Sequence, residues 1–102
     1  MGFQVFLAQE ALSDLERLVA YIAAQNPEAA TRLGYDLLDS ALSLANLPER
    51  GRVVPEFRRG DLREIVVRSY RIIYRIKPAE QEVEIVRFWH AARGFPHIQQ
   101  GD

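Results

Sequence analysis

The first half of the chain carries a short apolar run followed by a stripe of apolar positions at helical spacing. Residues 3–8 (FQVFLA) have the length and composition of a strand. From Gln9 the apolar residues recur every three or four positions, which predicts an amphipathic helix. The stripe consists of Leu12, Leu15, Val19 and Ile22. Asp14 and Glu16 fall near its first turns, where negative charge suits the helix dipole. We expect the helix to end near Asn26, because Pro27 disfavours helical geometry in the residue before it.

A second helix is predicted for residues 26–46. Asn26 is a favourable N-cap and Pro27 suits the first helical position. The apolar stripe of this helix consists of Leu33, Leu37, Ala41 and Leu44. Because the link between the two helices is so short, they should form an antiparallel hairpin. Both stripes then need a sheet against which they can be buried.

Three consecutive strands are predicted between residues 62 and 90, at 62–67, 70–76 and 82–90, because β-branched and aromatic residues dominate this region. Side chains alternate between the two faces of a strand. One face of the middle strand therefore carries Tyr70, Ile72, Tyr74 and Ile76, and the other carries Arg71, Ile73 and Arg75. We interpret the apolar face as the core side and the arginine-bearing face as the functional side.

The order of elements predicts an α+β fold, β-α-α-β-β-β, in a single domain that spans residues 1–102. Residues 48–60 are rich in Pro, Gly and Arg and are predicted to be a loop. Its arginines are Arg50, Arg52, Arg58 and Arg59. The tail from residue 91 is too short for another full element. If the helices cover the sheet, six apolar side chains should be buried together: Leu15, Val19, Leu37, Leu44, Ile72 and Tyr74.

Composition narrows the class of protein. With 48% hydrophobic and 26% charged residues, the chain is typical of a globular domain. It has no cysteine, which excludes disulfides and thiolate metal sites. We find no signal-peptide pattern and no apolar stretch long enough to cross a membrane, so we expect a cytoplasmic protein without membrane contact. Phosphate loops, dinucleotide-binding turns and metal-spaced His/Cys clusters are absent, so no cofactor or metal is expected.

The net charge of −1 conceals an asymmetry between the two halves. Residues 1–50 contain three basic and seven acidic residues, whereas residues 51–102 contain ten basic and seven acidic residues. Most of the basic residues are arginines, which suit bidentate contacts with phosphate or carboxylate. A general nucleic-acid binder would normally be more basic overall.

Three stretches of the chain form a recognisable combination: NPEAATRL, LPERGRVVPEF, and LREIVVRSYRIIYRI continuing to EIVRFWHAAR. Taken together, they resemble the RelE/ParE superfamily of toxins from bacterial type II toxin–antitoxin systems. The resemblance covers nearly the whole chain. It implies a small twisted, largely antiparallel sheet with a helical hairpin on one face. It also implies a cognate antitoxin that wraps and blocks the toxin in a hetero-oligomer.

Members of this superfamily fall into groups that act on different targets. RelE-like members cut messenger RNA on the ribosome, with a basic cluster on the open sheet face and usually a tyrosine near the C-terminus. ParE-like members lack much of that cluster and poison DNA gyrase. No tyrosine follows Arg93 here and lysine is nearly absent, which favours a ParE-like, non-enzymatic toxin acting on gyrase. The alternative is a ribosome-dependent mRNA endoribonuclease. A second alternative is a non-toxic binding module on the same fold.

The candidate site residues depend on that choice. If the chain is a ribonuclease, Arg71 and Arg93 would hold the phosphate and His90 would move protons, because histidine exchanges protons readily near neutral pH. His90 could instead be a strand-end residue hydrogen-bonded to the following loop. Arg71 could instead pair with Glu64 or Glu84. The candidates for target binding are Arg63, Arg68, Arg75 and Trp89, although Trp89 could also belong to the core or face the antitoxin.

Overall fold

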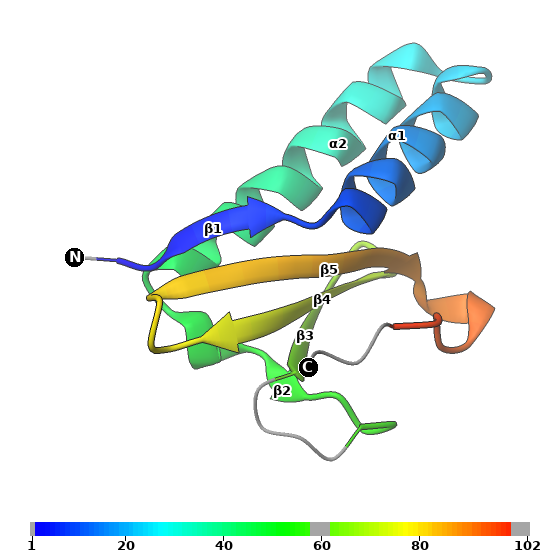
Figure 1. Cartoon of the computed structure of the whole chain (residues 1–102). Helices are drawn as coiled ribbons and strands as arrows, with labels where there is room; N and C mark the ends of the chain where they lie inside the picture. Colours follow the sequence, from blue (N-terminus) through cyan, green and yellow to red (C-terminus); the bar gives the residue numbers. More distant parts are fainter. Residues whose placement is uncertain (1, 58–61, 99–102) are drawn as a thin grey trace.

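The computed structural model describes residues 2–57 and 62–98, and in this part of the chain two helices lie against one face of a five-stranded sheet (Figure 1). The elements are β1 (Gln4–Leu7), α1 (Gln9–Ala23), α2 (Pro27–Leu42), β2 (Arg52–Val53), β3 (Leu62–Val67), β4 (Tyr70–Lys77) and β5 (Glu82–His90). Single 3₁₀ turns are η1 (Ser43–Ala45), η2 (Pro48–Arg50) and η3 (Ala91–Arg93). The predicted α+β class and element order are confirmed.

The strand order in the sheet is β1-β5-β4-β3-β2. β1 runs parallel to β5, and every other neighbouring pair is antiparallel. The prediction that residues 48–60 form only a loop is wrong at Arg52–Val53, which pair with Glu64 and Arg63 at the sheet edge. Two residues are too few to leave a periodic pattern. Residues 58–61, including the predicted loop arginines Arg58 and Arg59, lie outside the described residues.

The helical hairpin begins and ends for local reasons. The side chain of Asn26 accepts a hydrogen bond from the Ala29 backbone N–H (3.1 Å), and Pro27 occupies the first turn of α2. Both helices end a few residues earlier than predicted, and η1 continues the direction of α2. Within the described residues, no helix has the length and apolar character needed to cross a bilayer.

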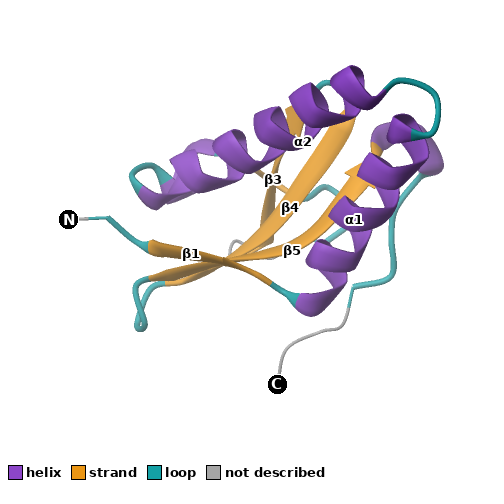
Figure 2. Ribbon diagram, turned by 90° about the horizontal axis from the view of Figure 1, so that it is seen from above, coloured by secondary structure: helices purple, strands orange, loops and turns teal. Residues whose placement is uncertain are grey.

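The main core lies between the hairpin and the sheet (Figure 2). Of the six side chains predicted to meet there, five are buried in one cluster: Leu15, Leu37, Leu44, Ile72 and Tyr74. Val19 is half-buried against the same cluster. The tyrosine belongs there because its hydroxyl reaches the edge of the core, where it donates to the Pro48 carbonyl oxygen (2.7 Å) and accepts from the Gly51 N–H (2.9 Å). The predicted alternation of faces along β4 is confirmed.

The opposite face of the sheet is less open than the sequence suggests. A second apolar cluster covers part of it and consists of Val54, Leu62, Ile73, Val86 and Ile98, with Phe57 and Phe95 packed against them. The segment after η3 therefore folds back over the sheet, although it forms no further helix or strand among the described residues. The rings of Phe57 and Phe95 meet edge to face, with centroids 5.0 Å apart. Only part of the arginine-bearing face is therefore available to a ligand.

Candidate functional site

Arg71, the arginine that the sequence placed on the functional face, lies in a buried ion-pair network. Its Nε donates to Glu64 Oε1 (2.5 Å), while Nη2 and Nη1 donate to the two carboxylate oxygens of Glu56 (3.0 and 3.3 Å). Glu64 is fully buried and also accepts from Arg52 (2.6 Å). Of the two pairings considered from the sequence, Arg71 with Glu64 is confirmed. Glu84 instead binds Arg75 (3.4 Å).

The protonation of this network follows from its contacts. Burial works against the charged form of Arg71, but the hydrogen bonds to Glu56 and Glu64 outweigh it, so the pKa of Arg71 is raised. The hydrogen bond from Arg71 is the main cause of a lowered pKa at Glu56. Arg71 is therefore a fixed cation that two carboxylates neutralise in the free protein.

The arginines predicted to bind a target also have partners within the chain. Arg63 donates to the Gly51 carbonyl oxygen (2.8 Å) and helps to hold η2 against the sheet. Arg68 lies in the turn between β3 and β4 and pairs with Asp36 of α2 (2.5 Å). Arg68 and Asp36 are both about half exposed, so this pair is open to solvent. A role of these arginines in target binding stays a prediction.

Trp89 lies opposite Arg71 in the sheet register and is half-buried. Two guanidinium groups lie over its ring, that of Arg93 at 4.0 Å and that of Arg87 at 4.8 Å from the centroid. Arg87 is also held by the Asp14 carboxylate of α1 (2.7 and 2.9 Å). Arg93 forms no ion pair with another described residue. Stacking on Trp89 therefore positions Arg93 and leaves its N–H groups available to an anion.

His90 ends β5 in a defined orientation. Its Nδ1 accepts a hydrogen bond from the Ala92 backbone N–H (3.1 Å), and its ring packs edge to face on Tyr70 with centroids 5.1 Å apart. An imidazole that accepts at Nδ1 carries its proton on Nε2. The alternative of a strand-end histidine bonded to the following loop is thus confirmed, and the hydrogen-bonding capacity left to this ring is donation from Nε2.

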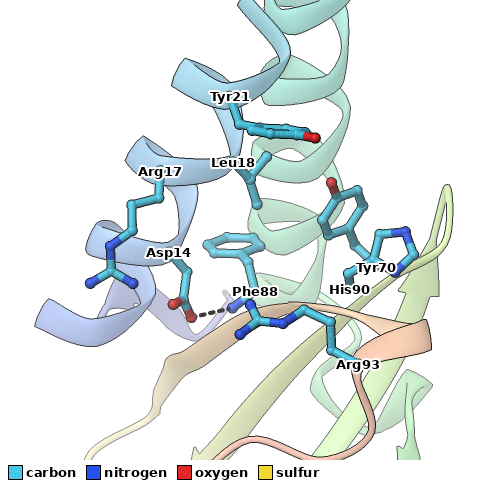
Figure 3. Close-up of a pocket in the computed structure, with 8 residues that line it drawn as sticks. All are labelled: Asp14, Arg17, Leu18, Tyr21, Tyr70, Phe88, His90 and Arg93. Carbon is cyan, nitrogen blue, oxygen red and sulfur yellow. Dashed lines mark hydrogen bonds between the residues drawn. The ribbon is translucent and has the colours of Figure 1, made fainter.

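His90 and Arg93 both line a cleft of about 300 Å³ between α1 and the end of β5 (Figure 3). The side chains of Leu18 and Phe88 line its apolar part, together with the Tyr70 ring. Its polar lining comes from Asp14, Arg17, Tyr21, His90 and Arg93. The structure thus brings together two of the three residues predicted for catalysis and separates Arg71 from them, because Arg71 does not line this cleft.

The residues of α1 in this cleft were not identified as site residues from the sequence. Asp14, Arg17 and Tyr21 occur at spacings of three and four, which puts them on one side of a helix beside the apolar stripe. This spacing of polar residues is the feature of the sequence that could have identified them as site residues. The expectation that Asp14 serves the helix dipole is wrong, because Asp14 is buried and accepts hydrogen bonds from Arg87 and from the Phe88 N–H (3.2 Å). Only Glu10 is an acid of the first turn.

Comparison with known proteins gives the family. The model of the ParE toxin of type II toxin–antitoxin systems, parDE, matches residues 5–95. The chain belongs to this toxin family. Two relatives from Caulobacter vibrioides, Toxin RelE2 and Toxin RelE1, are 43% and 36% identical over 91 residues. These alignments cover 88% of this chain and 97% and 95% of the relatives. The RelE/ParE resemblance inferred from the sequence motifs is confirmed.

Solved structures of RelE/ParE toxins share the fold. A chromosomal ParDE system from P. aeruginosa superposes with a TM-score of 0.72 at 18% identity and covers 86% of this chain and 95% of its own. The toxin–antitoxin complex RelBE2 from Mycobacterium tuberculosis gives a TM-score of 0.66 at 22% identity, with coverages of 88% and 92%. A mutant of the E. coli toxin RelE in the free state gives 0.63 at 14% identity, with coverages of 92% and 88%.

Proposed function

We propose that this type II toxin is an endoribonuclease that acts on messenger RNA, with the scissile phosphodiester bound in the cleft between α1 and the end of β5. One observation carries the proposal: the cleft combines two arginines that have no carboxylate partner among the described residues with a histidine and two tyrosines. The RelE name of both Caulobacter relatives supports the same choice. We therefore prefer messenger RNA to gyrase as the target of this toxin, in contrast to the preference drawn from the sequence.

The chemistry of RNA cleavage assigns a role to each group. The 2′-oxygen attacks phosphorus, the bond to the 5′-oxygen breaks, and negative charge builds up on the phosphate oxygens. Arg17 and Arg93 would stabilise that charge from opposite sides of the cleft, since α1 contributes one and η3 the other. Arg93 is already positioned by its stacking on Trp89, so this arginine would need little reorganisation during the reaction.

His90 has a narrower role here than the sequence suggested. Because its Nδ1 is bound by the Ala92 N–H, the ring can donate from Nε2 to a phosphate oxygen or to the leaving 5′-oxygen. The proton of the 2′-hydroxyl would have to pass to the phenolate form of a tyrosine, either Tyr70 beside His90 or Tyr21 across the cleft, and water would protonate the departing 5′-oxygen. The proposal therefore makes His90 a hydrogen-bond donor and places the base function on a tyrosine.

Gyrase poisoning is the second candidate function. It is favoured by the neutralisation of Arg71 by Glu56 and Glu64, which leaves less positive charge for RNA in the free toxin. The family model that matches the chain also carries the ParE name. Under this alternative the same cleft would contact a protein surface, and no side chain would need to move a proton.

One experiment separates the two targets. Purified toxin is added to translating ribosomes with a defined message and, separately, to a gyrase supercoiling assay. We expect positioned mRNA cuts that Arg17→Ala and Arg93→Ala each reduce by about 100-fold, the order expected for the loss of one hydrogen-bond donor to the transition state. Arg32→Ala is the matched control, because it removes an exposed arginine of α2 outside the cleft. Intact message together with inhibited supercoiling would overturn the ribonuclease assignment.

We also infer that a cognate antitoxin holds this toxin in a hetero-oligomer. Two of the structural neighbours come from toxin–antitoxin systems. Several large apolar side chains of the hairpin are exposed here, including Tyr21, Tyr35 and Leu42, which suits an amphipathic partner segment. Co-expression with the neighbouring small open reading frame should give a stable complex and relieve a growth defect. Normal growth without that partner would instead favour a non-toxic binding module.

A further inference from the structure

The two glutamates that bind Arg71 differ sharply in how firmly they are held. The Glu64 side chain is fully buried in the sheet and binds Arg52 as well as Arg71. The Glu56 side chain is 41% exposed and reaches Arg71 from the segment that follows β2. Losing Glu64 would remove the buried counter-charge of Arg71, whereas an ion pair with one solvent-exposed partner contributes less to stability. Glu56 is therefore the partner that another anion can replace.

The contact between Glu56 and Arg71 has the geometry of phosphate recognition. The two carboxylate oxygens face Nη1 and Nη2 in parallel, at 3.3 and 3.0 Å. Carboxylate and phosphate present the same pair of acceptors to this edge of a guanidinium group. The Nε of Arg71 stays on Glu64, and its Cζ lies 5.2 Å from the centroid of the Phe95 ring, so removing Glu56 would leave the guanidinium oriented.

We propose that Glu56 is an autoinhibitory residue that occupies the phosphate-binding edge of Arg71 in the free toxin and is displaced by a phosphodiester of single-stranded RNA. This inference rests on the proposed ribonuclease function for the identity of the ligand. The position is suitable, because Nη1 of Arg71 also contacts the carbonyl oxygen of Gly94 (3.3 Å), the residue after Arg93. An RNA strand leaving the cleft past Arg93 would thus meet Arg71 next.

The net charge of the ion-pair cluster also supports the displacement of Glu56 by a phosphate. In the free toxin Arg52 and Arg71 are balanced by Glu56 and Glu64, so the cluster is neutral. When Glu56 leaves, the cluster has one net positive charge that is directed at the position of the departing carboxylate. A bound phosphate then restores neutrality. The second candidate, gyrase, would not require this exchange.

The test uses a short 2′-O-methyl oligoribonucleotide, which lacks the attacking hydroxyl and so reports binding without cleavage. Glu56→Gln should bind it about three- to fivefold more tightly than wild type, the upper part of the range for a solvent-accessible ion pair, because Glu56 is exposed but Arg71 is buried. Glu80→Gln is the matched control, because it removes the same charge from an exposed position in the β4–β5 turn. Equal affinity of the two variants would overturn the proposal.

A second measurement separates failure of this inference from failure of the proposed function. Inorganic phosphate is titrated into the labelled toxin while the Arg71 Nε–H signal is followed by NMR. In Glu56→Gln the signal should shift at a several-fold lower phosphate concentration than in Glu80→Gln. If phosphate shifts the signal in this way but the oligonucleotide does not bind, Glu56 does block Arg71, and RNA is rejected as the ligand. An Arg71 signal that phosphate does not move in either variant would reject the contact itself.

Discussion

Asp14 and Arg87 lie 73 positions apart and form two hydrogen bonds, at 2.7 and 2.9 Å, where α1 crosses the edge of β5. β1 stops at Leu7, opposite Ile85, so the following part of β5 has no neighbouring strand on that side within the described part of the chain. The Asp14 carboxylate fills the gap by accepting from the Phe88 N–H. The Asp14 side chain thus accepts a backbone hydrogen bond that a neighbouring strand would otherwise accept, and it orients Arg87 beside Trp89.

Asp14→Asn tests this relationship. The amide can still accept from the Phe88 N–H, but it leaves the mostly buried guanidinium of Arg87 without its counter-charge. We expect a loss of about 3 kcal/mol in the free energy of unfolding, the range measured when a buried ion pair loses one partner. Denaturant titration measures it. Asp39→Asn, at an exposed position of α2, is the control; a change in Asp14→Asn no larger than in this control would contradict the assignment.

Leu37→Ala tests the packing of the hairpin on the sheet. Leu37 is fully buried in the main core, so truncation removes apolar contacts and leaves a cavity. The variant should lose about 2–5 kcal/mol of unfolding free energy in a denaturant titration. Leu42→Ala removes the same atoms from a side chain that is 54% exposed, and it should stay within about 0.5 kcal/mol of wild type. Similar losses in both variants would show that the core is misassigned.

A substitution in the turn between β3 and β4 should increase the stability of the protein. Arg68 and Ser69 both have positive φ angles, 51° and 72°, which a two-residue hairpin turn of this kind needs and which suit Asn-Gly best. Ser69→Gly should raise the thermal midpoint and stabilise the fold by about 0.5–1 kcal/mol, because glycine adopts this conformation without steric cost. Ser69→Ala keeps the Cβ atom and should give no gain. A midpoint that falls in the glycine variant would argue against this turn geometry.

The Glu56–Arg71 contact should make stability depend on acid pH. Because the hydrogen bond from Arg71 lowers the pKa of Glu56 below its ordinary value of 4.5, the unfolded chain takes up this proton first as the pH falls. The stabilising contribution is therefore complete above the ordinary pKa and is lost as the pH falls through the lowered pKa.

Unfolding titrations of wild type and Glu56→Gln at a series of pH values measure this dependence. The difference in the free energy of unfolding between wild type and Glu56→Gln should be constant above about pH 5.5. It should shrink below about pH 4.5, where protonation of the unfolded chain sets in. Glu80→Gln should show no such pH-dependent difference. If the difference between wild type and Glu56→Gln does not change with pH, Glu56 is not held by Arg71 in solution.

Local periodicity was sufficient to predict most elements of this protein. The ranges of β3 and β5 follow from their β-branched and aromatic residues. The two faces of β4 follow from alternation, since successive strand side chains must point to opposite sides. The stripe of α2 and most of the stripe of α1 follow from the 3.6-residue period, and Asn26-Pro27 marks the boundary between the helices. The prediction is wrong at Leu12, which is exposed, whereas the neighbouring Ala11 is buried. The family motifs lie within or beside these same elements, so the amino-acid sequence alone indicates the toxin family.

Tertiary structure alone decided which side chains work together. Nothing in the sequence around Glu56 predicts that it reaches Arg71, and nothing around Asp14 predicts Arg87, because such contacts depend on how distant elements pack. The parallel placement of β1 beside β5 has the same origin. The arginine-bearing face was predicted from alternation, but its neutralisation by carboxylates and its partial cover by the chain after η3 were not. Periodicity reports the face on which a side chain lies, whereas its partners are set by the packing of the whole chain.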